Sequence, residues 1–328
     1  MAQNPPQPRS SPTYPFAGIP TFLRSEICTD LDKLDADIAI VGAPTDEGSP
    51  FLPGSRLGPR GIREHSLRFG AEGYYDHRRQ KQFLEREQKE GRIVDVGDVD
   101  ILPTNVEDTF ANITSTVQQI LARGALPVVL GGDHAISFPV VRAYSEPLHV
   151  VHFDAHIDYA PFQHGFEFTN AHAFRHIHHM AHVQSLTQVG VRSLRNPRSW
   201  LEDSIGDGNS VISVYELRER GPGQLFGGLP AGERCYVSID IDVLDLPLVP
   251  GCVSAEPNGL TYEELRDCLE AIAERMDVVG LDLVEVNPLL DVPTGITSYV
   301  AAHAILEFLG QICDQPRWKG RHQASDIG

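Results

Sequence analysis

Short apolar runs alternate along the chain with segments of amphipathic character. Runs of strand type occupy residues 36–43, 92–99, 127–130, 148–153, 186–191, 211–214, 234–241 and 278–286. Apolar residues at helical spacing occupy residues 106–123, 135–144, 262–276 and 296–312, and a further helix is expected to start at 61–67. Strands that alternate with helices predict an α/β fold with a mainly parallel sheet covered on both faces.

The domain organisation follows from the same pattern. No repeat of fixed period and no linker interrupts residues 21–328, which are therefore predicted to form a single domain. Residues 1–20 are rich in proline, serine and asparagine. They are predicted to form an N-terminal arm that is either disordered or lies on a neighbouring subunit.

Three of the predicted strands end in side chains that commonly bind metals. The segments are Gly131-Gly132-Asp133-His134, Asp154-Ala155-His156-Ile157-Asp158 and Ser238-Ile239-Asp240-Ile241-Asp242. Residues two apart in an extended chain point the same way, and the carboxyl ends of parallel strands open onto one crevice. The sequence therefore predicts that six ligands converge, namely His134, Asp154, His156, Asp158, Asp240 and Asp242.

The composition of this set favours two metal ions over one. Four carboxylates and two imidazoles exceed what a closed structural zinc site uses, since such sites prefer cysteine and histidine. The set suits two divalent ions that prefer oxygen and nitrogen and share bridging carboxylates. We therefore predict a binuclear metallohydrolase, in which the metal pair generates a hydroxide at neutral pH.

Three further residues are candidates for the same crevice. Glu285 ends a strand before Asn287-Pro288, where a carboxylate could clamp a guanidinium by paired hydrogen bonds; a plain strand-end turn is the alternative. His172 lies in the loop after the second ligand segment, whereas the other histidines of 172–182 are expected on a helix surface. Cys252 follows Pro250-Gly251 just after the third segment and is predicted to lie near the site.

Bulk composition excludes several classes of partner. A formal net charge of −18 argues against nucleic acid, which requires a basic face. This negative charge would attract metal ions or a small cationic substrate, although a need for solubility alone also explains the charge. No apolar stretch approaches the roughly 18 residues of a membrane helix, and no signal peptide is visible. Five scattered cysteines without a CxxC pair indicate reduced thiols, so a cytoplasmic location is predicted.

The three ligand segments also carry a family resemblance. GGDHAIS, FDAHID and SIDIDVLD resemble the three signatures of the ureohydrolase family, which includes arginases, agmatinases and related amidinohydrolases. AGIPTFLR at 17–24, PGSRLGPRGIREHS at 53–66 and LVEVNP extend the likeness over most of the chain. The resemblance implies an arginase-like three-layer α/β/α sandwich, two manganese ions and hydrolysis of a guanidino compound to urea plus an amine or ammonia.

The resemblance also implies roles for individual residues. One metal would be held by His134, Asp154, Asp158 and Asp240, and the other by His156, Asp154, Asp240 and Asp242, so that Asp154 and Asp240 bridge. Asp158 would pass a proton to the departing amine, and Glu285 would orient the guanidinium.

Departures from the family pattern bear on the substrate. The usual HGT-like histidine step reads Asn170-Ala171-His172, so Asn170 or His172 takes its place in substrate binding or catalysis. The arginase element that grips an α-amino acid is not seen. A small guanidine or an agmatine-like amine is therefore expected rather than arginine, with an agmatinase or guanidinobutyrase proper as the alternative. The altered loop resembles the guanidine-hydrolase branch, which makes nickel the alternative to manganese.

Two other functions compete with this reading. One is a single-zinc deacetylase of the arginase fold, for which the tandem histidine pair is not evident. The other is a non-catalytic partner subunit of a hetero-oligomeric ureohydrolase, against which the intact ligand set argues. The resemblance itself suggests a homo-oligomer, either a trimer or a hexamer.

Overall fold

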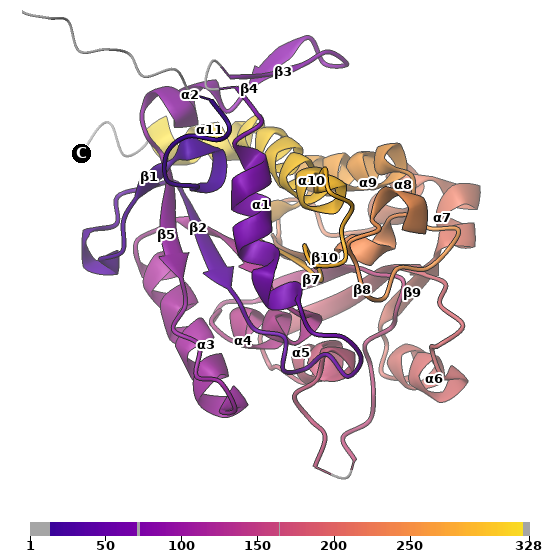
Figure 1. The fold of residues 1–328 in the computed structure, drawn as a ribbon. Coiled ribbons are helices and arrows are strands. Elements are labelled where there is room, and N and C mark those ends of the chain that lie inside the picture. Colours follow the sequence, from indigo (N-terminus) through magenta and orange to yellow (C-terminus); the bar gives the residue numbers. More distant parts are fainter. Residues whose placement is uncertain (1–13, 71–72, 164, 324–328) are drawn as a thin grey trace, which may run out of the picture.

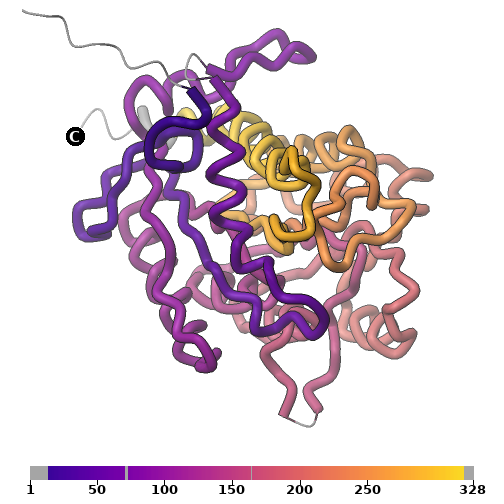
Figure 2. Tube along the Cα trace, viewed as in Figure 1, coloured from indigo at the N-terminus to yellow at the C-terminus, as the bar shows by residue number. Residues whose placement is uncertain are grey.

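A parallel β-sheet organises the part of the chain that the structure describes. The computed structural model describes residues 14–70, 73–163 and 165–323, in which nine strands follow the order β1-β5-β2-β6-β11-β10-β7-β8-β9 (Figures 1 and 2). Every pair of neighbouring strands in this sheet is parallel. The strands are β1 Glu26–Ile27, β2 Ile38–Ala43, β5 Ile93–Asp98, β6 Leu126–Gly131, β7 Leu148–Phe153, β8 Val183–Val191, β9 Ser210–Ser213, β10 Arg234–Asp240 and β11 Asp277–Val284; β3 Tyr74–Asp76 and β4 Lys81–Phe83 pair separately as a hairpin.

Helices cover both faces of the sheet, and alternate strand residues feed two separate cores. In β2, Ile38 and Ile40 pack into the core under α1 and α8 to α10, whereas Ala39 and Val41 pack into the core under α3 to α5. The predicted mainly parallel sheet and three-layer sandwich are therefore confirmed. The α-helices are α1 Gly58–Ser66, α2 Glu85–Lys89, α3 Val106–Ala122, α4 Ser137–Val141, α5 Ala173–His178, α6 Arg198–Gly206, α7 Val214–Arg220, α8 Pro222–Phe226, α9 Tyr262–Arg275, α10 Ile296–Cys313 and α11 Pro316–Gln323.

The long helices begin and end where local side-chain chemistry requires. The Asn105 side chain caps α3 by accepting from Asp108 N, and Gly124 follows the helix with φ +75°. Thr261 and Glu264 form a capping box at the start of α9. Seven short 3₁₀ turns occur in the described residues: η1 Phe22–Arg24, η2 Leu31–Lys33, η3 Ser55–Leu57, η4 His134–Ile136, η5 Asn170–His172, η6 Ile241–Val243 and η7 Leu246–Leu248.

The helix predicted at 135–144 takes a different form. Asp133 accepts a hydrogen bond from Ala135 N, so the chain leaves β6 through η4 before it enters the short helix α4. The helices α6, α7 and α8 were not predicted. They are short and expose many of their residues, so they carry little of the apolar periodicity that marks a long core helix.

The helix α10 is apolar enough to raise the question of a membrane. By length and composition its 18 residues would suffice to cross one, but 72% of that window is buried inside the protein. It packs against α1 and α9 and supplies residues such as Ile305 and Phe308 to the core. It is therefore a core helix, while the cytoplasmic location stays a prediction.

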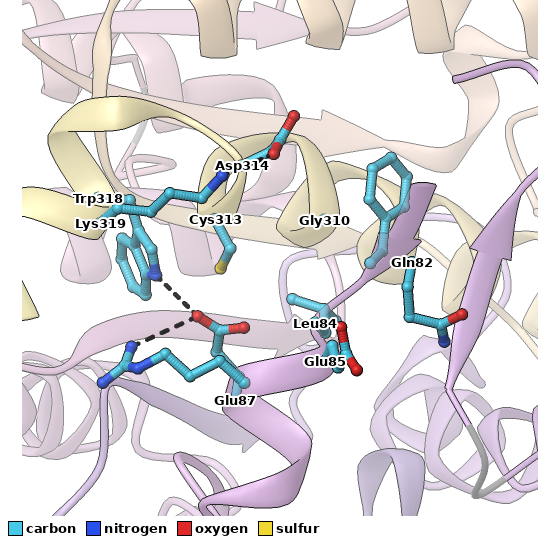
Figure 3. A pocket seen from close by; sticks show the side chains of 11 residues that line it. Gln82, Leu84, Glu85, Glu87, Gly310, Cys313, Asp314, Trp318 and Lys319 are labelled. Atoms are coloured by element: carbon cyan, nitrogen blue, oxygen red, sulfur yellow. Dashed lines mark hydrogen bonds and ion pairs between the residues drawn. The ribbon is translucent and has the colours of Figure 1, made fainter. Parts of the chain in front are cut away.

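The two ends of the sheet differ in what they carry. The strands β6, β11, β10 and β7 are neighbours at the centre of the sheet, and their carboxyl ends hold the predicted ligand segments. A pocket near the opposite end lies between α2, the last turn of α10 and α11 (Figure 3). There Glu87 accepts a hydrogen bond from Trp318 Nε1 and pairs with Arg86. Its charge is therefore compensated by neighbouring side chains of the fold.

The predicted N-terminal arm is described only in part. Residues 1–13 lie outside the described residues. Of the following segment, Tyr14, Phe16 and Ile19 are exposed, and the Tyr14 and Phe16 rings stack with their centroids 5.2 Å apart. Contact of this arm with a second subunit stays a prediction.

The segment 53–66, which resembles a family loop, contains a buried arginine, Arg63, that forms a salt bridge with Asp95. Arg63 on α1 donates through Nε and Nη2 to both oxygens of Asp95, at 2.8 and 2.9 Å, and through Nη1 to Asp98 at 2.5 Å. Asp95 also accepts from Phe22 N. The pair thus joins α1, β5 and the N-terminal segment at a buried position.

We predict that Arg63→Met strongly destabilises the protein, because it leaves Asp95 as an unpaired buried carboxylate. The expected loss is about 3–5 kcal/mol, measured as a shift in urea-induced unfolding. The control Lys89→Met breaks the exposed pair with Glu85 and should cost no more than about 0.5 kcal/mol. Equal losses in the two variants would contradict the role assigned to Arg63.

Candidate metal centre

Turns at the strand ends, rather than the strands themselves, present the predicted ligands. β7 ends at Phe153, so Asp154 to Asp158 lie beyond it, and Asp158 has φ +45°. β10 ends at Asp240, and Asp242 lies in η6. The alternating direction of side chains along a strand therefore does not explain why these side chains point toward one another. Their convergence comes from tight backbone turns at the carboxyl ends of adjacent strands.

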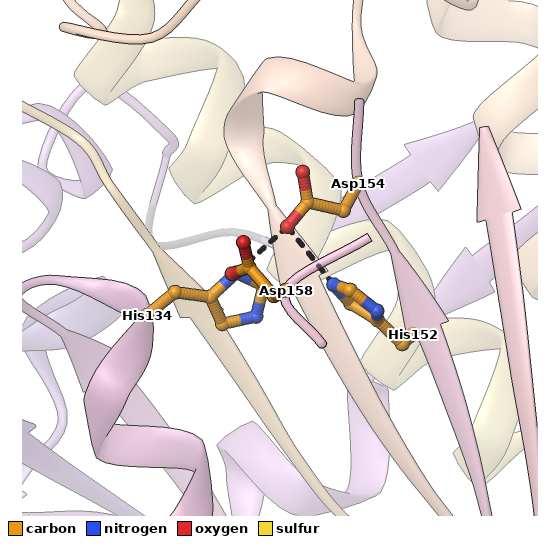
Figure 4. Close-up of side chains that lie close together, drawn as sticks. All are labelled: His134, His152, Asp154 and Asp158. Atoms are coloured by element: carbon orange, nitrogen blue, oxygen red, sulfur yellow. Dashed lines mark hydrogen bonds and ion pairs between the residues drawn. The ribbon is translucent and has the colours of Figure 1, made fainter. Parts of the chain in front are cut away.

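The first group of side chains gathers around His134. Its Nδ1 lies 2.9 Å from Asp154 Oδ2, 3.4 Å from Asp158 Oδ2 and 3.2 Å from Asp240 Oδ2. Figure 4 shows His134, Asp154 and Asp158 facing one another, with the His152 ring on the other side of Asp154. One imidazole nitrogen and three carboxylate oxygens thus surround a single small space.

The second group gathers around His156. Its Nδ1 lies 3.2 Å from Asp154 Oδ1 and 3.1 Å from Asp242 Oδ2. The two oxygens of Asp154 therefore face different histidines: Oδ2 faces His134 and Oδ1 faces His156. The structure brings all six predicted side chains to one crevice, and Asp154 is placed between the two groups as the resemblance implied for a bridging ligand.

The chemistry of these groups fits two divalent cations. Among the described residues, His134 Nδ1 and Asp242 Oδ2 are buried and have no hydrogen-bond partner, which is costly unless a ligand satisfies them. Burial and neighbouring carboxylates raise the pKa of Asp158, Asp240 and Asp242. A pair of cations would remove this repulsion and would use the unpaired atoms.

A buried hydrogen-bond chain orients His134 from behind. Its Nε2 lies 2.9 Å from Ser238 Oγ, and Ser238 donates to Asp282 Oδ1 at 2.7 Å. Asp282 Oδ2 accepts from Ser137 and Tyr236. With its hydroxyl proton given to Asp282, Ser238 accepts from His134 Nε2, so Nδ1 presents its lone pair to the crevice.

His152 was not predicted, and it supports Asp154. Ser204 donates to Gln188 Oε1, so Gln188 Nε2 faces His152 Nδ1 at 3.3 Å. His152 Nε2 therefore carries the hydrogen and donates to Asp154 Oδ2 at 2.9 Å. Burial lowers the pKa of His152 to about 4, so the ring stays neutral. The available signal was a histidine inside an apolar strand, two residues before Asp154.

Glu285 lies where the prediction put it, directly after β11. It has φ +64°, which is unusual for a residue with a long side chain. Its Oε1 accepts from His134 N at 3.0 Å, whereas Oε2 is buried without a hydrogen-bond partner among the described residues. Burial and the nearby carboxylates of Asp240 and Asp133 raise its pKa. A cationic group bound beside Glu285 would satisfy this oxygen.

The glycines before His134 serve close packing rather than a left-handed turn. A Cβ on Gly132 would overlap Thr45 O, and one on Gly131 would overlap the Val284 side chain. Neither glycine has positive φ. The two glycines let the end of β6 approach the neighbouring segments.

The remaining predicted residues lie on the loop side of the crevice. His172 ends η5, its Nδ1 lies 2.7 Å from Thr169 Oγ1, and its ring stacks on Phe162. These contacts belong to its own loop, so the catalytic role of His172 stays a prediction. Asn170 N donates to Gly48 O at 3.3 Å, which places Asn170 against a loop that also binds Asp133; its substrate role likewise stays a prediction.

Cys252 is buried beside the second group of ligands. Its sulfur and ligand oxygens of Asp240 and Asp242 all lie within 4.8 Å of one another. The expectation that this cysteine lies near the site is therefore confirmed.

Comparison with known proteins agrees with the arrangement. A model of the arginase family matches residues 36–310. The chain belongs to the arginase family. The predicted ureohydrolase family and its class of hydrolytic enzyme are thereby confirmed, and a binuclear divalent-metal site is consistent with the cluster of histidine and aspartate side chains.

Several characterised members of the family resemble the chain over most of its length. Proclavaminate amidinohydrolase from Streptomyces clavuligerus is 32% identical over 309 residues, which are 92% of this chain and 95% of that protein. Its solved structure superposes with a TM-score of 0.82 at 30% identity, covering 91% and 98% of the two chains. Agmatinase from Pyrococcus horikoshii is 34% identical over 285 residues, 85% and 93% of the two chains. Guanidinopropionase from Pseudomonas aeruginosa is 32% identical over 329 residues, 94% and 96% of the two chains.

We predict that Ser238→Ala weakens metal binding, because His134 Nε2 loses the acceptor that orients the ring. Losses of about 10- to 100-fold in metal affinity are typical when such a supporting contact is removed. Competition with a chromogenic chelator would measure the affinity, and Ser210→Ala on the exposed start of β9 is the matched control. Unchanged affinity in Ser238→Ala would contradict the proposed orientation of His134.

Proposed function

We propose that the protein is a binuclear-metal amidinohydrolase that cleaves a C–N bond of a guanidino compound and releases urea plus an amine or ammonia. The observation that carries the proposal is the placement of one unpaired, buried carboxylate oxygen, Glu285 Oε2, beside two clusters that share Asp154. The clusters suit a pair of metal ions, and the unpaired oxygen suits the cationic group of the substrate.

The ligand assignment follows the family resemblance and agrees with the distances. His134, Asp154, Asp158 and Asp240 would hold one ion, and His156, Asp154, Asp240 and Asp242 the other. Bound there, the ions would supply activation of water and stabilisation of the charge that develops on the substrate. Manganese is the first candidate and nickel the alternative.

The chain's own residues would position the substrate and move a proton. Glu285 is held on one side by His134 N, so its Oε2 can accept from a guanidinium in a fixed direction. Asp158, with Oδ2 facing His134 Nδ1, would carry a proton to the departing amine. His172 and Asn170 are proposed to face the rest of the substrate from the η5 loop.

The choice of guanidino compound is a separate matter from the reaction. The similar proteins are named for different activities, as an agmatinase, a guanidinopropionase and a proclavaminate amidinohydrolase, so similarity alone does not select a substrate. Our sequence-based expectation is a small guanidine or an agmatine-like amine rather than arginine, in a cytoplasmic trimer or hexamer.

The test is urea release from a panel of guanidino compounds by protein loaded with manganese or nickel. The panel would contain guanidine, agmatine, 4-guanidinobutyrate and arginine. Urea from at least one compound, dependent on added metal, is the expected result. Absence of urea from every compound, with two metals bound per chain, would instead favour the non-catalytic partner subunit, and acetate release from acetylated amines would favour a deacetylase.

We predict that Asp158→Asn lowers kcat by at least about 100-fold, because an amide neither carries the proton nor donates a negative charge to the crevice. Metal content measured in parallel would show how much of the loss comes from weaker binding. Asp203→Asn, which alters an exposed carboxylate paired with Arg175, should leave kcat unchanged. Turnover of Asp158→Asn close to that of the parent would rule out this residue as the proton carrier.

A further inference from the structure

Arg195 is a partly exposed cation that lies directly over a predicted metal ligand. It belongs to the connection between β8 and α6, and its side chain is 57% exposed. Its Nη2 lies 3.0 Å from His156 Nε2 and donates to Ser254 O at 2.7 Å, while Nε donates to Glu256 Oε1 at 2.9 Å. The guanidinium therefore lies at the rim of the crevice, on the His156 side.

The side chain is held in place rather than free to sample solvent. Glu256 Oε1 also accepts from Ser193 Oγ at 2.6 Å, and Ser193 Oγ accepts from Arg195 N. Asn196 accepts from Ile157 N and donates to Ala155 O, which ties this connection to the second ligand segment. An arginine so positioned has lost much of its conformational entropy before a ligand arrives.

One nitrogen of the Arg195 guanidinium is also left without an acceptor among the described residues. Among the described residues its Nη1 makes no hydrogen bond. Two other arginines near the ligand segments are directed elsewhere: Arg192 donates to backbone carbonyls including Asp242 O and Glu256 O, and Arg56 pairs through Nε and Nη2 with the buried Asp46. The rim thus presents a fixed positive group in a chain whose formal net charge is −18.

We propose that Arg195 determines specificity by binding a carboxylate at the far end of the guanidino substrate. This inference rests on the proposed function and narrows its substrate class to guanidino acids. Glu285 contacts the His134 group and Arg195 contacts the His156 group. A substrate that spans the two groups would therefore meet a carboxylate oxygen at one end and guanidinium N–H donors at the other. A distal ammonium would face a like charge at Arg195, and free guanidine would offer no acceptor to its Nη1 donor.

This assignment differs from the sequence-based expectation of a small guanidine or an agmatine-like amine. The competing interpretation is that Arg195 is only structural and that Glu256 receives a distal ammonium. The two interpretations predict opposite preferences for two substrates of similar length, 4-guanidinobutyrate and agmatine, which carry a carboxylate and an ammonium respectively.

The experiment compares kcat/KM for these two compounds, measured by urea release, in the parent protein, Arg195→Gln and Arg195→Glu. The parent should favour 4-guanidinobutyrate. Arg195→Gln should lose about 10- to 100-fold in kcat/KM for the acid, chiefly through KM, because a charge-assisted hydrogen bond is lost. Agmatine should be turned over no worse, and Arg195→Glu should reverse the preference.

Three controls make the outcome decisive. Arg198→Gln changes an exposed arginine on the same segment, which pairs with Glu202 on α6, and should leave both substrates unaffected. Because Arg195 touches His156, metal content is measured in all variants, and it should be equal if Arg195 acts on the substrate alone. Calorimetric titration of both compounds into metal-loaded protein reports the preference independently of turnover.

The two proposals fail in different ways. Urea formation with the same acid-to-ammonium ratio in the parent and in Arg195→Gln overturns the role of Arg195 and leaves the amidinohydrolase intact. Absence of urea from every compound overturns the proposed function. In that case equal calorimetric affinities in parent and Arg195→Gln would also overturn the role of Arg195, whereas selective loss of acid binding would support it.

Discussion

The structure depends above all on gathering four aspartates at the ends of two neighbouring strands, β7 and β10, at the centre of one sheet. Buried carboxylates repel one another, and burial disfavours their charged forms, so such a cluster opposes folding unless cations or donors compensate. The chain supplies part of the compensation through the two imidazoles and through backbone N–H groups such as those of Ala155 and His156. The remainder falls to the metal ions that the unpaired atoms are arranged to receive.

Neutral side chains do most of the orienting around this cluster. The side chains in direct contact with the two rings are uncharged: Gln188, held by Ser204, faces His152, and Ser238 faces His134. A charged partner in these positions would change the total charge that the crevice must balance. Neutral partners set the orientation of the rings and leave that total charge unchanged. Asp282, the negative group behind Ser238, accepts hydrogen bonds from three hydroxyl groups. Ser238 separates it from His134.

The fold and the convergence of the six candidate ligands could be predicted from sequence because both follow from local patterns of residues. Buried strands are continuous apolar runs, and each ligand group follows such a run directly, as Asp154 follows β7 and Glu285 follows β11. The reasons behind the geometry could not be predicted in the same way. The turn at Asp158, the contact of Gly132 with Thr45 and the support of Asp154 by His152 and Gln188 depend on segments that meet only in the folded chain. Short exposed helices such as α7 were missed because packing, not periodicity, stabilises them.

The same distinction explains why substrate preference is harder to infer than reaction class. The proposed reaction requires only that the candidate ligands and Glu285 meet at the ends of the central strands, and these residues stand in recognisable segments. In our proposal, substrate preference depends on Arg195 and its partner Glu256, which come from loops about 60 residues apart and meet only in the folded chain. Loops tolerate change because the sheet, not the rim, maintains the position of the reacting groups. This chain can therefore keep its chemistry at the strand ends, while the proposed role of Arg195 makes the sign of one charge at the edge of the site decide which end group the substrate must carry.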